Sequence, residues 1–120
     1  MVAALKELRE LRLVMRACAD VTRLRILRLL ADGSERSVTD LTASLYLSQP
    51  LVSWHLRILR RSGLIAARRT GRQSLYWLNR NGWDAFRSRL EQALGPSPVT
   101  SWEGEPGPRL TALRRQESPG

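Results

Sequence analysis

The sequence predicts a mainly helical domain with one small β-hairpin, ordered as four helices, two strands and a fifth helix. Three observations lead to this fold class. Apolar residues recur every three or four positions as far as Gly63, short extended runs with a different period follow, and helical spacing then returns. The chain has 120 residues, of which 42% are hydrophobic, and this suits a single domain with one modest core.

Two amphipathic helices are predicted before Gly33. The second helix follows Asp20, whose carboxylate suits a helix N-cap, and it ends before Gly33 because glycine readily takes the left-handed conformation found at helix ends. The first helix covers residues 3–18, and charged side chains separate its apolar positions, which are Leu5, Leu8, Leu11, Met15 and Cys18.

Two further helices follow, joined by a tight connection. The third begins near Ser37, and Asp40 stands three positions on, where it completes a capping box. The fourth is capped by Ser48 and tolerates Pro50, since a proline in the first turn removes no helical hydrogen bond. It ends at Gly63, and its inward side chains are Val52, Leu56 and Leu59.

The hairpin is predicted from two short extended runs, residues 64–69 and 75–78, joined by a polar segment that contains Gly71. Residues 95–120 hold five of the six prolines and four of the eight glycines, so we expect a flexible tail after a folded domain of residues 1–94. Between them a fifth helix begins near Asn81, with Asp84 placed to complete its cap. One side of this helix carries Trp83, Phe86, Leu90 and Leu94.

Positive charge is concentrated in one third of the chain. The formal net charge is +9, and the segment between Asp40 and Asp84 contains seven arginines and no acidic residue. Such a localised field suits a polyanionic partner. One cysteine cannot form an internal disulfide, and we find neither a secretion signal nor the roughly 20 apolar residues that a bilayer span needs. We therefore expect a cytoplasmic protein with no membrane association.

The third and fourth helices, with their short connection, match a helix-turn-helix. In this motif one helix braces across the phosphate backbone while the next lies in the major groove of DNA. The hairpin then stands as a wing against neighbouring phosphates. The sequence thus predicts a winged helix-turn-helix whose DNA-binding residues are Ser48, Gln49, Ser53, Trp54, His55, Arg57, Arg60, Arg68, Arg69 and Arg72.

Residues 17–90 resemble the ArsR/SmtB family of winged-helix bacterial repressors. Residues 19–27 (ADVTRLRIL) are similar to the second-helix motif of the family, and residues 47–56 (LSQPLVSWHL) to its recognition helix. Residues 59–65 and 70–72 resemble the start and the tip of the wing. The resemblance implies a homodimer, closed by the first and last helices, that binds an inverted repeat and releases it when an inducer binds. The corresponding interface residues are Leu5, Leu8, Leu11, Met15, Trp83, Phe86 and Leu90.

The metal sites of the family have no counterpart in this sequence. Members that sense arsenite or soft metals carry paired thiols where this chain has Ser37 and Thr39. The other common site needs histidine on the last helix, and residues 80–94 contain none. The resemblance therefore implies DNA binding without a metal or other cofactor, with a metal site of unrecognised ligands as the alternative.

Three residues of the predicted helix-turn-helix each leave two interpretations open. The family position that matches Trp54 is normally polar, so the indole either contacts a thymine methyl or packs beneath the wing. His55 matches a histidine common in the family, which either bonds a phosphate or braces the wing. Tyr46 stands where the family turn often has a small residue, so either the turn differs or some backbone strain is tolerated.

Cys18 and the aromatic residues of the last helix are also open to two interpretations. The position of Cys18 on an apolar face favours a buried thiol that acts as a small hydrophobe. The alternative is a redox switch in which two copies of Cys18 pair across the dimer. Trp83 and Phe86 favour packing in the core or the dimer, with an aromatic effector pocket as the alternative.

The predicted function is sequence-specific binding of double-stranded operator DNA by a homodimeric repressor. Catalysis is not predicted, because no nucleophile, base and acid can be placed together and no glycine-rich phosphate loop occurs. Three alternatives remain, which are a winged helix that contacts protein or RNA, a repressor governed by the thiol of Cys18, and a metal sensor with unrecognised ligands. The sequence identifies neither an operator nor an effector.

Overall fold

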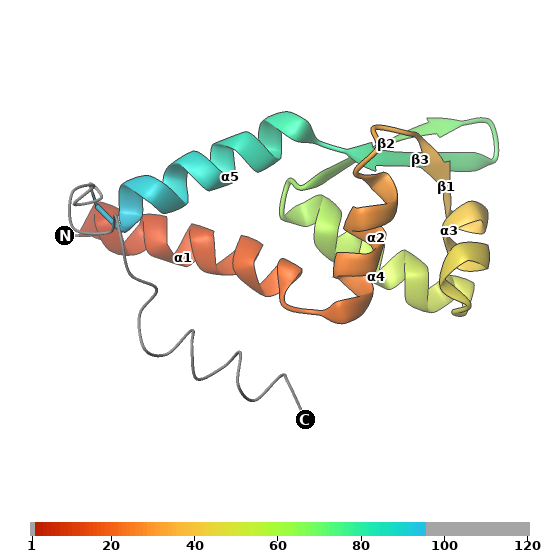
Figure 1. The fold of residues 1–120 in the computed structure, drawn as a ribbon, viewed down its shortest axis with the longest axis horizontal. Helices are drawn as coiled ribbons and strands as arrows, with labels where there is room; N and C mark the ends of the chain where they lie inside the picture. The colour runs from red at the N-terminus through yellow and green to blue at the C-terminus, as the bar shows by residue number, and fades with distance from the viewer. Residues whose placement is uncertain (1, 96–120) are drawn as a thin grey trace, which may run out of the picture.

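A computed structural model describes residues 2–95, and Figure 1 shows how their elements are arranged. The predicted fold class is confirmed, and the predicted tail lies outside the described residues apart from Gly95. None of the helices between residues 2 and 95 combines the length and apolar character needed to cross a membrane. The elements are α1 (Val2–Cys18), α2 (Val21–Leu30), β1 (Arg36–Ser37), α3 (Val38–Leu45), α4 (Gln49–Arg61), β2 (Ile65–Thr70), β3 (Gln73–Leu78) and α5 (Arg80–Ala93).

The N-caps predicted for three helices are confirmed. Asp20 Oδ2 accepts a hydrogen bond from the backbone N–H of Arg23 at 3.0 Å, which starts α2. Ser37 and Asp40 form the expected capping box at the start of α3, and Ser48 caps α4. These side chains satisfy backbone N–H groups that have no partner within their own helices.

The predicted cap of α5 is wrong. The helix begins at Arg80, and its N-cap is Asn79, whose Oδ1 accepts a hydrogen bond from the backbone N–H of Gly82 at 3.2 Å. Asp84 lies in the second turn, beyond the unpaired N–H groups, and instead pairs with Arg87 at 2.9 Å. The Nδ2 of Asn79 also donates to the carbonyl of Gly63 at 3.0 Å, so one residue joins α5 to the turn after α4.

The sheet contains a strand that the sequence did not predict. Its order is β1-β3-β2, with both pairs antiparallel, and β1 has only two residues, which pair with the middle of β3. So short a strand has no periodicity of its own. The first hairpin strand is shifted by one residue from the predicted run and the second begins two residues earlier, because Thr70 pairs with Gln73 and leaves a two-residue turn with Gly71 at φ 59°.

The turn between α3 and α4 is made by Tyr46 in the left-handed conformation, with φ 57° and ψ 41°. This supports the interpretation that strain is tolerated there, at a cost of about 1 kcal/mol or more for a residue with a Cβ. The side chain of Tyr46 is almost fully exposed, so the strained turn gains no core packing in return.

The hydrophobic core lies among α2, α3, α4 and the start of β2. The helices α1 and α5 lie side by side and extend away from the sheet (Figure 1). α1 contributes Ala17 to the core cluster, and α5 contains no buried residue. The other members of the cluster are Ile26, Leu27, Leu30, Leu41, Leu45, Val52, Leu56, Leu59, Leu64 and Ile65.

Candidate nucleic-acid interface

The helix α4 has one completely buried side and one basic, exposed side. Val52, Leu56 and Leu59 have no exposed surface, as the helical spacing predicts. On the opposite side, Arg57 and Arg60 are exposed, and neither takes part in an ion pair within residues 2–95. Gln49 and Ser48 are exposed at the N-terminal end of the helix, while Ser53 is half-buried. The buried face holds the helix in place, so the basic face points outward.

The arginines of the hairpin are not equivalent. Arg69 and Arg72 are exposed at the end of the hairpin, and Arg69 Nε donates to the carbonyl of Gly71, at 3.4 Å. Arg68 also lies at the surface, but its guanidinium pairs with Glu35 at 2.7 Å. The sequence grouped Arg68 with the other two because Glu35 is 33 positions away, and only the fold brings it next to β2.

His55 is buried rather than at the edge of the DNA-facing surface. Its Nδ1 lies 3.1 Å from Nη1 of Arg23 on α2 and 3.9 Å from Oδ2 of Asp20. Burial lowers the pKa of His55, the Asp20 carboxylate opposes that shift, and the Arg23 guanidinium adds to it. The contact to α2 is one that neither of the two predicted roles included.

Trp54 packs toward α2 and keeps half of its surface exposed. Its ring meets His55 edge to face, with centroids 5.0 Å apart, and the guanidinium of Arg23 lies 6.0 Å from the ring centroid. Sequence reasoning missed Arg23 altogether. The signal for it was its place in the segment 19–27, which resembles the family motif.

Cys18 is half-buried at the end of α1, and burial raises the pKa of its thiol, which Arg23 only partly offsets. A raised pKa lowers the fraction of reactive thiolate at neutral pH. This environment agrees with the interpretation of Cys18 as a small hydrophobe, and a redox role stays a prediction.

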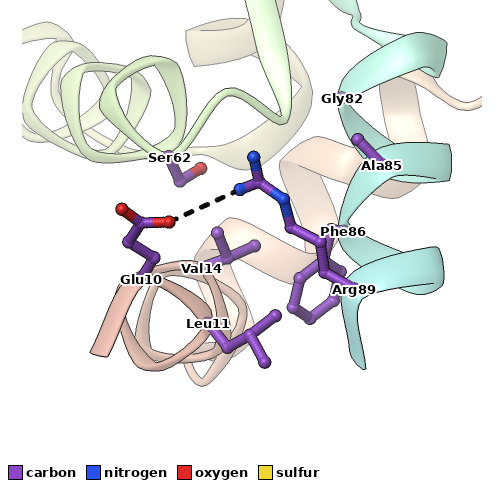
Figure 2. Close-up of a pocket in the computed structure, with 8 residues that line it drawn as sticks. All are labelled: Glu10, Leu11, Val14, Ser62, Gly82, Ala85, Phe86 and Arg89. Atoms are coloured by element: carbon purple, nitrogen blue, oxygen red, sulfur yellow. Dashed lines mark ion pairs between the residues drawn. The ribbon is translucent and has the colours of Figure 1, made fainter. Parts of the chain in front are cut away.

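A cavity of about 160 Å³ lies between α1, the end of α4 and α5. Figure 2 shows the ion pair of Glu10 and Arg89, 3.8 Å long, which joins α1 to α5 beside this cavity. Phe86 lines the cavity and meets Trp83 edge to face, at 6.2 Å between ring centroids.

A second, larger and predominantly apolar groove of about 490 Å³ also lies between α1 and α5. Leu8, Met15 and Leu90, three residues of the predicted interface, line it together with Leu94. Leu8 and Met15 are about half exposed and Leu94 is 80% exposed.

Three of the predicted interface residues have other contacts within the chain. Leu11 is buried although it also lines the groove, Trp83 packs against the core, and Phe86 lines the smaller cavity. Helical spacing placed them on one apolar stripe with the others, but a stripe wider than one contact surface can pack on two neighbours at once. Leu5 is half exposed on α1.

Residues 20–67 match the family described as bacterial regulatory proteins of the arsR family. A helix-turn-helix transcriptional regulator of Methanocaldococcus jannaschii is 37% identical over 65 residues, which cover 54% of this chain and 73% of that relative. The chain belongs to the ArsR family. The matched segment runs from the cap of α2 into β2, so it contains the helix-turn-helix and the first strand of the wing.

Two further comparisons support the same assignment. The transcriptional repressor SmtB of Mycobacterium tuberculosis is 42% identical over 65 residues, which cover 54% of this chain and only 47% of the repressor. The structure of HlyU from Vibrio cholerae is 35% identical, with a TM-score of 0.58 over 69% of this chain and 89% of that one. The chain is therefore a transcriptional regulator of a DNA-binding repressor family and not an enzyme.

The part of the chain that the structure describes gathers no group of three or more histidine, cysteine, aspartate or glutamate side chains able to hold a metal ion. The loss of the family's metal sites stays a prediction.

Proposed function

We propose that this ArsR-family regulator represses transcription as a homodimer bound to an inverted repeat in double-stranded DNA. In this proposal α4 enters the major groove, with Gln49, Ser53 and Trp54 nearest the base edges. The observation that carries the proposal is the two-sided character of α4. One face is held by the core, and the arginines of the other face are exposed and free of acidic partners within residues 2–95.

The arginines of α4 and the hairpin would supply the sequence-independent part of the affinity. Contacts of arginine with phosphates position a protein on the duplex and make binding sensitive to salt. Arg57 and Arg60 on α4 and Arg69 and Arg72 on the hairpin suit this role because they are exposed. Arg68 would contribute less, since Glu35 already neutralises much of its charge.

The groove between α1 and α5 supports the dimeric part of the proposal. Its lining includes the exposed side chains of Leu8, Met15 and Leu94, and an apolar surface of this kind favours burial against another protein surface. A second copy of the chain is the occupant we propose, because a two-fold axis would then present two copies of α4 to one face of the duplex. The two half-sites would lie about one helical turn, roughly 34 Å, apart.

We further propose that repression does not depend on a metal bound at the start of α3. Ser37 is buried, and its hydroxyl accepts a hydrogen bond from the backbone N–H of Asp40 at 3.1 Å. Its side chain is thus committed to capping the helix, and neither it nor Thr39 offers a thiolate. An inducer, where one exists, would have to act elsewhere.

The proposal is tested by selecting bound fragments from genomic DNA at near-physiological salt. The wild-type chain should recover one imperfect palindrome, and Arg57→Ala and Arg72→Ala should both weaken its binding. Arg87→Ala is the matched control, because it also removes one exposed arginine, from α5, where it pairs with Asp84. Salt-labile binding without any recovered motif would contradict the proposal and favour a winged helix that contacts protein or RNA.

A further inference from the structure

Arg23 joins three segments of the chain that are separate in the sequence. Its backbone N–H is capped by Asp20 at the start of α2, and its side chain reaches in two directions. Nε and Nη2 donate to the carbonyls of Ala17 and Arg16 at 2.7 and 3.3 Å, and Nη1 donates to Nδ1 of His55 at 3.1 Å. The same guanidinium therefore contacts the end of α1 and the middle of α4.

The hydrogen bonds from Arg23 to α1 lie at the C-terminal end of that helix. The last carbonyls of an α-helix have no partner within the helix, and the C-terminal end of the helix dipole favours a positive charge. Ala17 and Arg16 belong to the last turn of α1, and Ala17 is buried, so solvent cannot readily replace the arginine there.

The bond to α4 determines the chemical state of His55. A guanidinium only donates hydrogen bonds, so Nδ1 of His55 must accept and carry no proton. A neutral imidazole then carries its proton on Nε2. The charged groups that face the ring are Arg23, from α2, and Asp20, from the turn before it. Protonating Nδ1 would remove the acceptor and place a second positive charge beside the guanidinium.

We propose that Arg23, acting through Nδ1 of His55, is a positioning residue that fixes the orientation of α4 relative to α1 and so sets the distance between the two recognition helices of the dimer. This inference rests on the proposed function, in which α1 contributes to the dimer interface and α4 contacts DNA. The protein would then discriminate half-site spacing as well as base sequence. A recognition helix that is already held at a fixed angle loses little conformational entropy when it binds the correctly spaced operator.

The first test compares the recovered operator with versions that have one base pair added or removed at the centre. The wild-type chain should bind the altered spacings at least about tenfold more weakly, which is within the range expected for one wrong base pair. Arg23→Met should bind the correct spacing about tenfold more weakly, the loss expected for a hydrogen bond to a charged group. Its penalty for altered spacing should shrink to within about threefold, because a loosened α4 can follow the displaced half-site.

Two further variants distinguish loss of the Arg23–His55 hydrogen bond from loss of a positive charge and from loss of the His55 imidazole. Arg28→Met removes the same charge from an exposed position on α2 and should keep the spacing penalty of the wild-type chain. His55→Asn places an amide oxygen close to the position of Nδ1, where it can accept the bond from Arg23, so it should also keep the penalty. If Arg23→Met does not fold, Arg23→Lys serves in its place, since one ammonium cannot reach both α1 and His55. An Arg23 variant that is folded and keeps the full spacing penalty would overturn the proposal.

A second readout does not depend on DNA. His55 is the only histidine of the 120-residue chain, so the nitrogen resonances of a histidine-labelled sample report on it alone. The wild-type chain should show the neutral Nε2–H tautomer at pH 7.5, and Arg23→Met should show a mixture of tautomers. A proton on Nδ1 in the wild-type chain would overturn the link itself. If the wild-type chain selects no palindrome, the proposed function fails and the spacing role with it, while this spectrum still decides whether the Arg23–His55 bond exists.

Discussion

Two regions of the molecule differ in how much of their apolar surface is buried within one chain. The head, which comprises α2, α3, α4 and the three strands, surrounds the core, and its central side chains have almost no exposed surface. The arm, which comprises α1 and α5, gives the core cluster one residue, Ala17, and leaves a groove of apolar side chains open. The head therefore buries its apolar side chains within one chain, whereas the arm leaves an apolar groove that a second copy would cover in the proposed dimer.

Charge separates the two regions in the same way. On the arm, two exposed arginines of α5 have acidic partners, since Glu10 pairs with Arg89 and Asp84 with Arg87. On the head, the exposed arginines of α4 have no acidic partner within residues 2–95. A surface of unpaired arginines suits a polyanion, and a surface with an apolar groove suits another protein surface.

The largest effect is expected where the head meets the arm. A Cβ added at Gly82, in the first turn of α5, would overlap with the backbone carbonyl of Gly63, and backbone cannot yield as a flexible side chain can. Gly82→Ala should lower the free energy of unfolding by roughly 3 kcal/mol, at the upper end of overpacking costs. Urea denaturation monitored by circular dichroism measures this.

Gly33→Ala is the control for this substitution. Gly33 has a φ of +83° but open space around it, so only backbone strain of about 1 to 2 kcal/mol is expected. Equal losses in the two variants would mean that α5 is not packed closely on the turn after α4.

The second prediction concerns the open face of the arm. Leu94→Asp should weaken dimerisation by roughly 2 kcal/mol or more, about thirtyfold in the dissociation constant, because the dimer would have to bury an unpaired carboxylate. Sedimentation equilibrium measures this constant. Leu13→Asp is matched to it, since Leu13 is 65% exposed on α1 and does not line the groove. Equal weakening by both variants would place the interface elsewhere.

The third prediction compares two neighbouring arginines of β2. Arg69→Ala should reduce affinity for duplex DNA about threefold to tenfold and lower the slope of log affinity against log salt by about 0.9, the value for one phosphate contact. Arg68→Ala should do less, because Glu35 holds the Arg68 guanidinium. Fluorescence anisotropy at several salt concentrations tests both. A larger effect from Arg68 would mean that its ion pair with Glu35 opens when DNA binds.

Local features were far easier to predict from the sequence than contacts between distant positions. Caps such as Ser37 and Ser48 act within four residues of their own position, and the inward face of α4 follows from helical period alone. The contacts that were missed join distant positions. β1 pairs with residues about 40 positions away, Arg68 meets a carboxylate from another loop, and Arg23 meets His55 across 32 positions. Apolar spacing also cannot tell which part of the α1 and α5 stripes packs within the chain.

The smallest predicted effect concerns His55, which lies in the head but is linked by Arg23 to the arm. Its pKa in the folded chain lies below the usual 6.5, mainly because of burial, so the folded state favours the neutral ring. The contribution of this ring to stability is then fully present above about pH 6.5 and is lost as the pH falls from there toward the lower pKa of the folded state. Asp20, whose pKa is lowered from 3.8 chiefly by the backbone N–H of Arg23, loses its contribution only at more acidic pH.

These two pH ranges differ, so one titration distinguishes the contribution of the His55 imidazole to stability from that of the Asp20 carboxylate. The free energy of unfolding of the wild-type chain should decline as the pH drops below 6.5, and His55→Asn should remain level over that range. An equal decline in both proteins would assign the pH dependence to another group and weaken the case that the neutral imidazole connects head and arm. A decline confined to the wild-type chain would show that mild acid loosens this connection before it disturbs the cap of α2, because the lowered pKa of Asp20 keeps its carboxylate ionised there.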